Sequence, residues 1–592
     1  MLPKQPNNTT LQFMKQKICV TVLAAIFILS AGYSYAVTKS STGSGNWSTA
    51  ATWSPAGAPI AGDSVIVNNG HTITMDASGA SYCSGLNINQ GGTVTWPANS
   101  TNKLNISSSI TINGLLDMVG DIGIASGKPI NLGATGTLNW NPMTNTSAGA
   151  TLFTNGIENF SPTSTLIILK WYDFTVPLGS VISSNFGNVT LNSVRGGNTI
   201  VEWNQNNWFQ TRSILGTLTV ADAWITLDKS GSITNTSIGG IVLNTTNSTF
   251  YGLYGNSAGS FTLNTGSIAN NGGTFLGLTD GTGNIALNVT GNITNSGNFK
   301  LINNSGILNV GNGNASITVG GTFSQTAGDS RFIYNSTTIN SGIFTASINN
   351  MAISAGVFMG QYGIHNAGGT CTFNITNNLS LSSANSADIF RVIALTNISS
   401  NVNTAKLNFN IGGNLTINGH PNAEFTSSAG AGTETVTVGG NVNIFNGLNS
   451  FNYSTNAIAA HANSLSITGN FTQTGGNTFL SRLAGIHSLQ VTGAFSLSAG
   501  VVAIKSSVGA SNGNIDGNMQ VSGGFLYLHN NAVEVTADPC TLTVNGTFTH
   551  SNGNITFDDN ISNSSAQHWL ILKGNTCTLS GAAIMTHAGA GS

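Results

Sequence analysis

The chain repeats a short pattern in which apolar and polar residues alternate up to a glycine, and an apolar residue follows two positions later. Three copies are Leu287-Asn-Val-Thr-Gly291-Asn-Ile293, Val436-Thr-Val-Gly-Gly440-Asn-Val442 and Leu489-Gln-Val-Thr-Gly493-Ala-Phe495. Alternation with a period of two is typical of a β-strand. The repeated glycines are Gly291, Gly321, Gly413, Gly440, Gly469, Gly493, Gly523, Gly546 and Gly574. A weaker copy carries Asn377 there, from which we expect a left-handed backbone at this position.

The spacing of these glycines determines the class of fold. Adjacent glycines lie 23 to 30 residues apart, except for one gap of 92 residues. A repeat of this length indicates a solenoid, and three short strands with three turns fit within it. We therefore predict an all-β fold: a single-stranded, right-handed parallel β-helix with an N-terminal cap.

Two positions next to the glycine predict how successive coils pack. The position two residues after it is phenylalanine in five copies, and stacked coils are expected to pile these rings inside the tube: Phe323, Phe471, Phe495, Phe525 and Phe548. The position directly after the glycine is asparagine in five copies, which predicts a hydrogen-bonded ladder at the turn: Asn292, Asn414, Asn441, Asn470 and Asn575.

Residues 1–36 have the pattern of a secretory signal peptide. Lys15 and Lys17 precede an apolar run from Ile18 to Leu29, and small residues ending at Ala36 form a cleavage site. The run is too short to span a membrane, and no later stretch is long enough. We expect a secreted protein, extracellular or on the outer cell surface, with no membrane span.

Composition limits the classes of partner. Charged residues make up 6% of the chain. Removal of three signal-peptide lysines from the 17 basic residues leaves 14 against 19 acidic residues, a net charge near −5. This balance excludes a nucleic-acid footprint. What remains at the surface is amides, hydroxyls and some aromatic rings, which predicts neutral glycans or surface polymers as partners. The sequence does not indicate an oligomeric state.

Residues 43–95 differ from the repeats that follow. They contain Trp47, Trp53, Pro59, the run Gly62-Asp63-Ser-Val-Ile-Val and a strand–glycine–strand ending after Leu86. This stretch resembles the G-eight domain, and the chain resembles exported β-helix repeat proteins of the Bacteroidetes type. The resemblance implies an extracellular β-helix, in some cases connected with polysaccharides. Such proteins typically end in a type IX secretion sorting domain, which is missing before Ser592, so we expect a truncated C-terminus.

The predicted organisation has four segments. A signal peptide (1–36) precedes a G-eight-like capping segment (37–100), irregular early coils with longer loops (101–240) and regular coils (241–592). Trp47 and Trp53 either fill the cap or form a carbohydrate-stacking site. In the irregular coils, Trp203, Trp208 and Phe209 surround a run of amides and are the expected glycan-binding residues; the alternative is that they fill wide early coils.

A catalytic or metal site is not expected. A pectin-lyase-like enzyme needs clustered carboxylates, but the acids are scattered, and Asp558 and Asp559 alternate in direction along a strand. Relative to the nearest repeat glycines, His529, His550, His568 and His587 fall at different positions, so we expect scattered surface histidines, no metal and no cofactor. Cys371 and Cys540 are interpreted as small core residues, with a disulfide as the alternative.

Three functions are compatible with this sequence. An exported structural or adhesive β-helix that binds glycans without catalysis is favoured. The alternative is a carbohydrate-active enzyme, a polysaccharide lyase or glycoside hydrolase, on the same scaffold. An ice- or crystal-binding surface is disfavoured because a lattice-matched face requires coils of constant length.

Overall fold

The structure is a computed structural model of the chain. It describes residues 12, 15–17, 36–98, 100–141, 156–169, 185–192, 201–202, 213–228, 235–254, 260–279, 283–304, 314–340, 343–365, 370–395, 406–427, 433–451, 462–482, 486–506, 509–530, 539–558 and 567–586. Almost all regular structure is β-strand, and it forms a parallel β-solenoid of about 15 turns. The predicted all-β parallel solenoid is therefore confirmed; its right-handedness and its N-terminal cap stay predictions.

The chain divides into two compact units. Unit 1 contains residues 1–165 and 172–184, and unit 2 contains residues 166–171 and 185–592. Strand β14 (Thr165–Ile168) begins in the range of unit 1 and continues in that of unit 2. Unit 1 thus includes both the segment predicted as a cap and the first part of the segment predicted as irregular coils.

Unit 1 has two series of parallel strands. The first is β1 (Thr38–Ser41), β4 (Ser64–Val67), β6 (Ala80–Ile88), β8 (Lys103–Ile112), β11 (Lys128–Leu132) and β13 (Gly156–Phe160). The second is β2 (Gly45–Asn46), β5 (Thr72–Thr74), β7 (Thr93–Thr95), β9 (Leu115–Met118) and β12 (Thr137–Trp140). Additional elements are the 3-10 turn η1 (Ala50–Thr52), β3 (Trp53–Ser54), antiparallel to β1, and β10 (Asp121–Ile124), parallel to β8.

The two N-terminal tryptophans belong to the core of unit 1. Trp47 and Trp53 are each 2% exposed, and their rings meet edge to face with centroids 5.4 Å apart. The indole N–H of Trp53 donates to the carbonyl oxygen of Trp47 over 2.9 Å. Buried rings of this kind have no face available to a sugar, so Trp47 and Trp53 are not a carbohydrate-stacking site.

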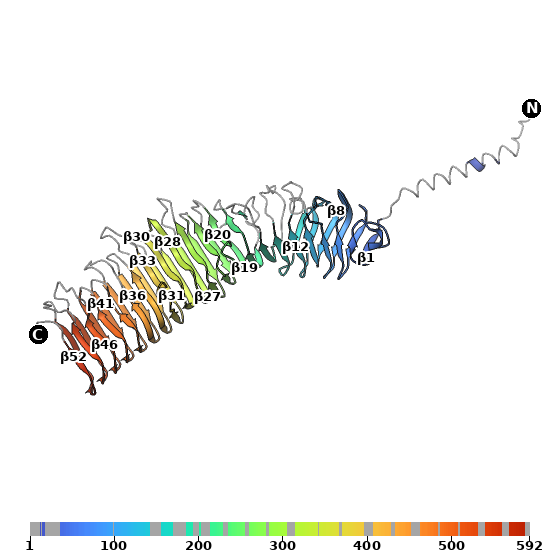
Figure 1. The fold of residues 1–592 in the computed structure, drawn as a ribbon. Coiled ribbons are helices and arrows are strands. Elements are labelled where there is room, and N and C mark those ends of the chain that lie inside the picture. Colours follow the sequence, from blue (N-terminus) through green and yellow to red (C-terminus); the bar gives the residue numbers. More distant parts are fainter. Residues whose placement is uncertain are drawn as a thin grey trace, which may run out of the picture. The chain divides into compact units, whose positions relative to one another are not determined.

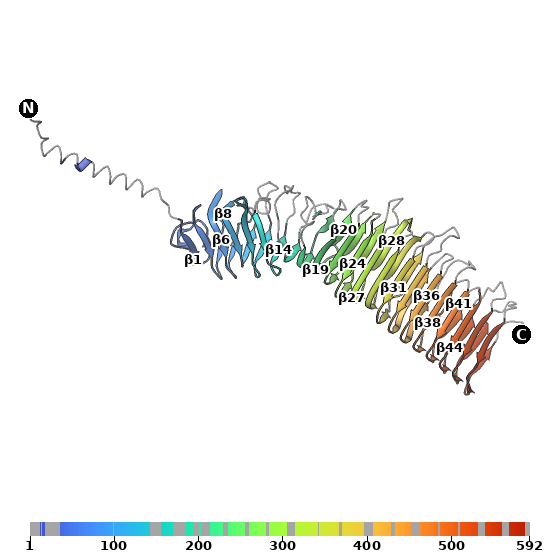
Figure 2. The ribbon, with the colours of Figure 1, turned by 180° about the vertical axis from the view of Figure 1, so that it is seen from behind.

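Unit 2 is built from three strand series, which Figures 1 and 2 show from opposite sides as strands lying side by side in successive coils. The first series is β17 (Ile214–Val220), β19 (Asn235–Leu243), β21 (Phe261–Thr265), β24 (Ile285–Val289), β27 (Ala315–Gln325), β29 (Phe344–Ile353), β31 (Thr370–Ile375), β34 (Lys406–Ile411), β36 (Thr433–Val438), β38 (Ala462–Ile467), β41 (Ile486–Val491), β44 (Ser511–Ile515), β47 (Cys540–Val544) and β50 (His568–Leu572). Strands β17, β19, β27 and β29 continue past the turn into the second series; the others end one or two residues before the turn residue, which is Asn377 after β31 and glycine after the rest.

The second and third series complete each coil. The second contains the C-terminal parts of β17, β19, β27 and β29, and β15 (Asn188–Leu191), β22 (Ile268–Asn270), β25 (Ile293–Asn295), β32 (Leu379–Ser382), β35 (Leu415–Ser427), β37 (Val442–Ser450), β39 (Phe471–Gln473), β42 (Phe495–Leu497), β45 (Met519–Val521), β48 (Phe548–His550) and β51 (Cys577–Leu579). The third contains the ends of β35 and β37, and β16 (Val201–Glu202), β18 (Trp224–Asp228), β20 (Thr249–Tyr254), β23 (Thr274–Thr279), β26 (Asn298–Asn304), β28 (Asp329–Asn340), β30 (Val357–His365), β33 (Ile389–Leu395), β40 (Asn477–Phe479), β43 (Val501–Lys505), β46 (Phe525–His529), β49 (Asn554–Asp558) and β52 (Ile584–Thr586).

The repeated glycine at the first turn, called the coil glycine below, is required by close contact between successive coils. It is not required by a left-handed backbone. A Cβ atom on Gly493 would lie 2.4 Å from the carbonyl oxygen of Gly469 and 2.5 Å from Oδ1 of Asn470, both in the preceding coil. The expectation of a left-handed backbone at this position is wrong. Positive φ angles occur seven residues later, at a second turn, with φ 74° at Gly476, 82° at Gly500 and 75° at Gly524.

The asparagine ladder is confirmed in its regular part. Oδ1 of Asn414, Asn441 and Asn470 each accepts the backbone N–H of the equivalent residue in the next coil over 2.8 Å. Asn292 accepts from the N–H of Thr322 in the same way. The amide oxygen of each asparagine lies against the glycine of the next coil. A larger residue in place of that glycine would therefore displace the asparagine side chain and break the ladder. Further ladder residues that the sequence analysis missed are Asn188, Asn350, Asn378 and Asn518.

The predicted phenylalanine stack is right at four of five positions. Phe323, Phe471, Phe495 and Phe548 are at most 1% exposed, and the rings of Phe471 and Phe495 stack with centroids 4.7 Å apart. Phe525 is 43% exposed, so its assignment to the core is wrong. It begins third-series strand β46, whereas Met519 pairs with both Phe495 and Phe548. The coil glycine here is Gly517, whose carbonyl oxygen crowds Gly546, and not Gly523.

These positions predict opposite results for two phenylalanines. Phe495→Ala should lower the free energy of unfolding by about 3–5 kcal/mol, because it opens a cavity between Phe471 and Met519. Phe525→Ala should change it by at most about 0.5 kcal/mol, as is usual for surface positions. Urea unfolding of both variants, followed by circular dichroism, measures the difference. Equal destabilisation by the two variants would contradict the assignment of Met519, in place of Phe525, to the buried stack between Phe495 and Phe548.

Candidate functional site

The predicted glycan-binding residues Trp203, Trp208 and Phe209 lie outside the described residues. Of that stretch the structure describes the backbone of β16, which pairs with β18. The assignment of these three side chains to glycan binding therefore stays a prediction.

Unit 1 contains a groove of about 410 Å³ on the outer face of β6, β8 and β10. Tyr82, 49% exposed, pairs in register with Asn105, which pairs with Gly123. A Cβ on Gly123 would lie 2.7 Å from Oδ1 of Asn105, so a larger residue here would displace that amide. Ser107 also lines the groove. The groove is therefore shallow and presents an aromatic ring, an amide and a hydroxyl group.

The charge in this groove is balanced. Nζ of Lys103 lies 3.3 Å from Oδ2 of Asp121, and Lys103 lines the groove. The described lining residues include no carboxylate. Buried Cys83 lies beneath, and burial, with a smaller contribution from Asp63, raises the pKa of its thiol to about 12. The groove therefore suits an uncharged polar ligand, and its described lining offers no pair of acidic groups for hydrolysis.

A second candidate site lies inside unit 2, near its C-terminal end. Six residues before the coil glycine, the first series carries polar residues that are paired in register from coil to coil. They are Glu434, Asn463, His487, Ser511, Cys540 and His568. The first five are at most 4% exposed. We call this set the first-series polar column.

The third series carries a corresponding column. Lys505, His529 and Asp558, each twelve residues after its coil glycine, are paired in register and have 0% exposure. We call them the third-series column. The thiol of Cys540 donates to the carbonyl oxygen of Leu528 over 3.2 Å, which places the two columns side by side. The two columns therefore meet inside the tube, where the third series of one coil approaches the first series of the next.

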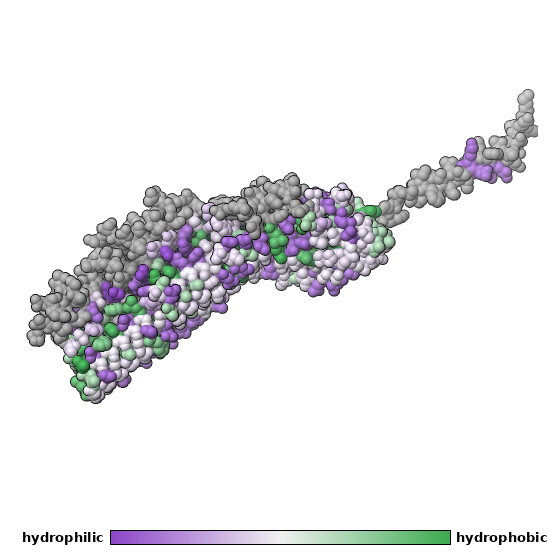
Figure 3. Space-filling view, in the orientation of Figure 1, coloured by the Kyte–Doolittle hydropathy of each residue, from purple (hydrophilic) through white to green (hydrophobic). Residues whose placement is uncertain are grey.

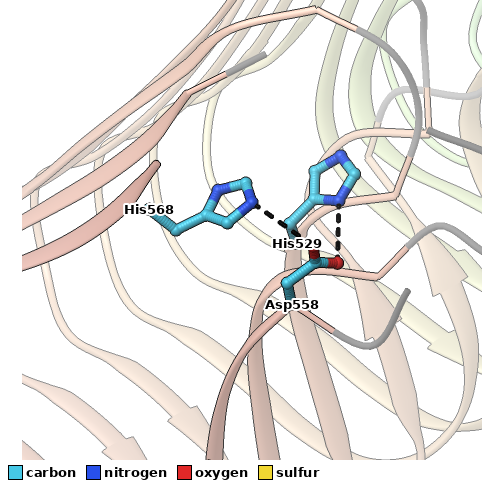
Figure 4. Close-up of side chains that lie close together, drawn as sticks. All are labelled: His529, Asp558 and His568. Atoms are coloured by element: carbon cyan, nitrogen blue, oxygen red, sulfur yellow. Dashed lines mark ion pairs between the residues drawn. The ribbon is translucent and has the colours of Figure 1, made fainter. Parts of the chain in front are cut away.

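His529, Asp558 and His568 converge where the columns meet (Figure 4). Nδ1 of His529 and Nε2 of His568 each lie 3.8 Å from a different carboxylate oxygen of Asp558, and all three side chains have 0% exposure. The two imidazole rings are nearly parallel, with centroids 5.2 Å apart. The backbone N–H of Cys540 donates to Nδ1 of His568 over 3.2 Å, which orients that ring. Two imidazole nitrogens and a carboxylate thus come within 4.8 Å of one another.

This geometry corrects the prediction of scattered surface histidines. His529 and His550 have 0% exposure, and His529 and His568 share Asp558; His587 lies outside the described residues. The error arose from measuring His529 from Gly523. Counted from Gly517, His529 falls at the same position as Lys505 and Asp558. Residues at two different positions of the repeat also point to one place, because the interior of a closed coil is shared by all three strands.

Two other histidines are held neutral by burial. Burial, with a smaller contribution from the nearby positive charge of Lys505, lowers the pKa of His487 to about 3. Nδ1 of His487 lies 2.5 Å from Oδ1 of Asn463. Burial lowers the pKa of His420 to about 4, against an opposing contribution from Asp388. Both rings are therefore uncharged in the folded protein at neutral pH.

The buried cysteines behave as core residues, as predicted. Cys83, Cys371 and Cys540 are free and buried, and Cys577 is free and exposed. Burial raises the pKa of the Cys371 thiol above the usual range, and that of the Cys540 thiol to about 12. These thiols stay protonated at neutral pH and are neither nucleophiles nor thiolate ligands.

Most described carboxylates have structural partners. Asp63 accepts the backbone N–H groups of Val37 and Ile60. Asp329 and Glu424 form ion pairs with arginine side chains. Asp516 accepts from the side-chain amides of Gln490, Asn514 and Asn545. Such side chains stabilise turns and strand faces and are not arranged as an acid–base pair.

No protein-family model and no curated protein sequence matches the chain. Among the described residues, no helix is long and apolar enough to cross a membrane. The proposals below therefore depend on the geometry and chemistry of the chain itself.

Buried neutral histidines predict a loss of stability in acid. Below pH 6.5, the ordinary pKa of histidine, the unfolded chain binds protons that folded His487 and His420 do not. Their contribution to stability is complete above this pH and is lost as the pH falls towards the folded pKa values. Each histidine should lower the free energy of unfolding by about 1.4 kcal/mol per pH unit in this window.

The variant His487→Gln removes one of the two imidazoles that bind a proton in the unfolded chain but not in the folded protein. Its free energy of unfolding should fall less steeply with decreasing pH than that of the wild type, by about 1.4 kcal/mol per pH unit. Urea unfolding at a series of pH values measures both slopes. A variant with the slope of the wild type would show that His487 is protonated in the folded protein.

Proposed function

We propose that the protein is an exported structural or adhesive β-helix that binds a neutral glycan without catalysis. The observation that carries this proposal is the groove of unit 1, where half-exposed Tyr82 lies in register beside Asn105 on a surface without net charge. A tyrosine ring offers an apolar face and a hydroxyl group, and the amide of asparagine both donates and accepts hydrogen bonds. These are the groups that a sugar ring, apolar on its faces and hydroxylated at its edge, requires.

The low charge of the chain supports the same class of ligand. With 6% charged residues, the surface cannot recruit a polyanion by releasing its counterions. Lys103, the cation in the groove, is paired with Asp121. A single shallow groove holds a ligand weakly, so tight binding requires a repetitive polymer that engages several sites at once. Trp203, Trp208 and Phe209 are the proposed additional contacts.

Export is part of this proposal. It is supported by the sequence pattern of residues 1–36, with two lysines before an apolar run and a small-residue cleavage site ending at Ala36. The resemblance of residues 43–95 to the G-eight domain, found in extracellular β-helical proteins of the Bacteroidetes type, supports the same location. A cell-surface or matrix role follows if the solenoid acts as a spacer that carries weak binding sites.

Retention on insoluble neutral polysaccharides tests the proposal. The wild-type protein should be retained by at least one of a β-glucan, a xylan and a mannan, equally at low and high salt. Tyr82→Ala should weaken retention about tenfold, since an aromatic contact contributes about 0.5–1.5 kcal/mol beyond its buried area. Phe445→Ala removes another half-exposed aromatic ring, in unit 2 and not among the residues that line the groove, and should bind as the wild type does.

Three results would contradict the proposal. Retention that disappears at high salt would indicate an ionic interaction. Equal loss in Tyr82→Ala and Phe445→Ala would indicate nonspecific adsorption through aromatic surfaces. Release of new reducing ends or unsaturated sugars would indicate the alternative, a polysaccharide-degrading enzyme. Weakening in Trp203→Ala with Trp208→Ala, at unchanged thermal stability, would add these residues to the binding surface.

A further inference from the structure

We propose that His529, Asp558 and His568 form a binding site for a divalent first-row transition-metal ion inside unit 2. This site is separate from the glycan-binding groove in unit 1, and its occupation does not depend on the proposed function. Two imidazoles and one carboxylate are a donor set that such ions accept, whereas Ca²⁺ and Mg²⁺ prefer oxygen ligands alone.

The distances between the donor atoms fit a metal ion better than direct hydrogen bonds. A hydrogen bond between nitrogen and oxygen spans about 2.7–3.2 Å, and both histidine–aspartate separations are 3.8 Å. Two ligands about 2.1 Å from a tetrahedral ion lie about 3.4 Å apart. The three donor atoms lie within 4.8 Å of one another, so the widest pair has to close by at most about 1.4 Å to bind one ion.

The fold fixes where these donors lie. His529 and Asp558 are neighbours in the third-series column, in register between β46 and β49. His568 lies in the first-series polar column on β50, in register with Cys540. Since each ligand is on a regular strand of the tube, a bound ion would link the first and third series and would stabilise this end of unit 2.

Two groups of Cys540, its thiol and its backbone N–H, lie beside the site. The Cys540 thiol donates to the carbonyl oxygen of Leu528 and is not one of the three donor groups that converge. The backbone N–H of Cys540 donates to Nδ1 of His568, which places the ring proton on Nε2 in the metal-free protein. Metal binding at Nε2 has to move this proton to Nδ1 and break that one hydrogen bond.

Metal content and spectroscopy test the site. The wild-type chain, unfolded with a chelator present and refolded with Zn²⁺, should retain about one Zn²⁺ per chain after dialysis, measured by elemental analysis. Refolding with Co²⁺ should give visible absorption bands of a nitrogen- and oxygen-ligated ion. Zn²⁺ should also raise the midpoint temperature of unfolding, whereas Mg²⁺ should not.

Two ligand variants and one matched control make the test specific. His529→Gln and Asp558→Asn should each weaken Zn²⁺ binding more than about 100-fold, because even residues behind the ligands contribute about 10- to 100-fold. His550→Gln removes another fully buried histidine, whose Nε2 lies 3.0 Å from the carbonyl oxygen of Gly553, outside the cluster. It should bind Zn²⁺ as the wild type does.

Clear results would overturn the site. A wild-type chain that retains no Zn²⁺ and shows no thermal shift would overturn it without reference to any variant. Retention of Zn²⁺ by Asp558→Asn at wild-type affinity would also overturn it, as would equal loss in His529→Gln and His550→Gln. If a ligand variant fails to fold, the wild-type stoichiometry, the Co²⁺ bands and the Zn²⁺-specific thermal shift decide the question.

Discussion

Each residue of a regular coil in unit 2 lies on the equivalent residue of the preceding coil, about 4.8 Å away along the parallel ladder. The remaining features depend on this register. It brings the amide oxygen of Asn470 against Gly493 and stacks Phe471 on Phe495. The side chain at each coil position therefore has to fit the equivalent side chains of the preceding and following coils, and one misaligned coil would displace its contacts with both.

Figure 3 shows apolar side chains gathered at the C-terminal end of unit 2, where β50 to β52 form the last described turn.

The same register explains how polar and charged groups come to be buried. A strand of the tube has one inward face, and any polar residue on that face is stacked on inward residues of the adjacent coils. Such groups need partners within the tube, since burying a polar group without them costs stability. Asn270 donates to Asn295 over 2.7 Å, and Gln473 donates to the carbonyl oxygen of Gly476 over 3.0 Å. The columns that meet at Asp558 are the charged version of this arrangement.

The repeat alone predicted the solenoid, the asparagine ladder and four of five core phenylalanines, because these follow from a period that can be counted in the chain. The coil at Gly517 was misread because Asp516-Gly517-Asn518-Met519 lacks phenylalanine, whereas Gly523 and Phe525 match the pattern by coincidence. The histidine–aspartate cluster was missed for a related reason. Its members stand at two positions of the repeat that become neighbours only when the coil closes, and the Tyr82 groove depends on a register between strands that no local pattern reveals.

Oxidative cross-linking tests the coil register most directly. Ser496 and Gln520 are opposite each other on β42 and β45, with both side chains outside the tube. Paired strand residues lie within the Cα separation of a disulfide. The double variant Ser496→Cys with Gln520→Cys should therefore form an intramolecular disulfide on oxidation, measured as a mass loss of two hydrogens that a thiol reductant reverses. If Gly523 were the coil glycine, Ser496 would oppose Leu526 instead. A disulfide in Ser496→Cys with Leu526→Cys, and none in the first pair, would contradict the account.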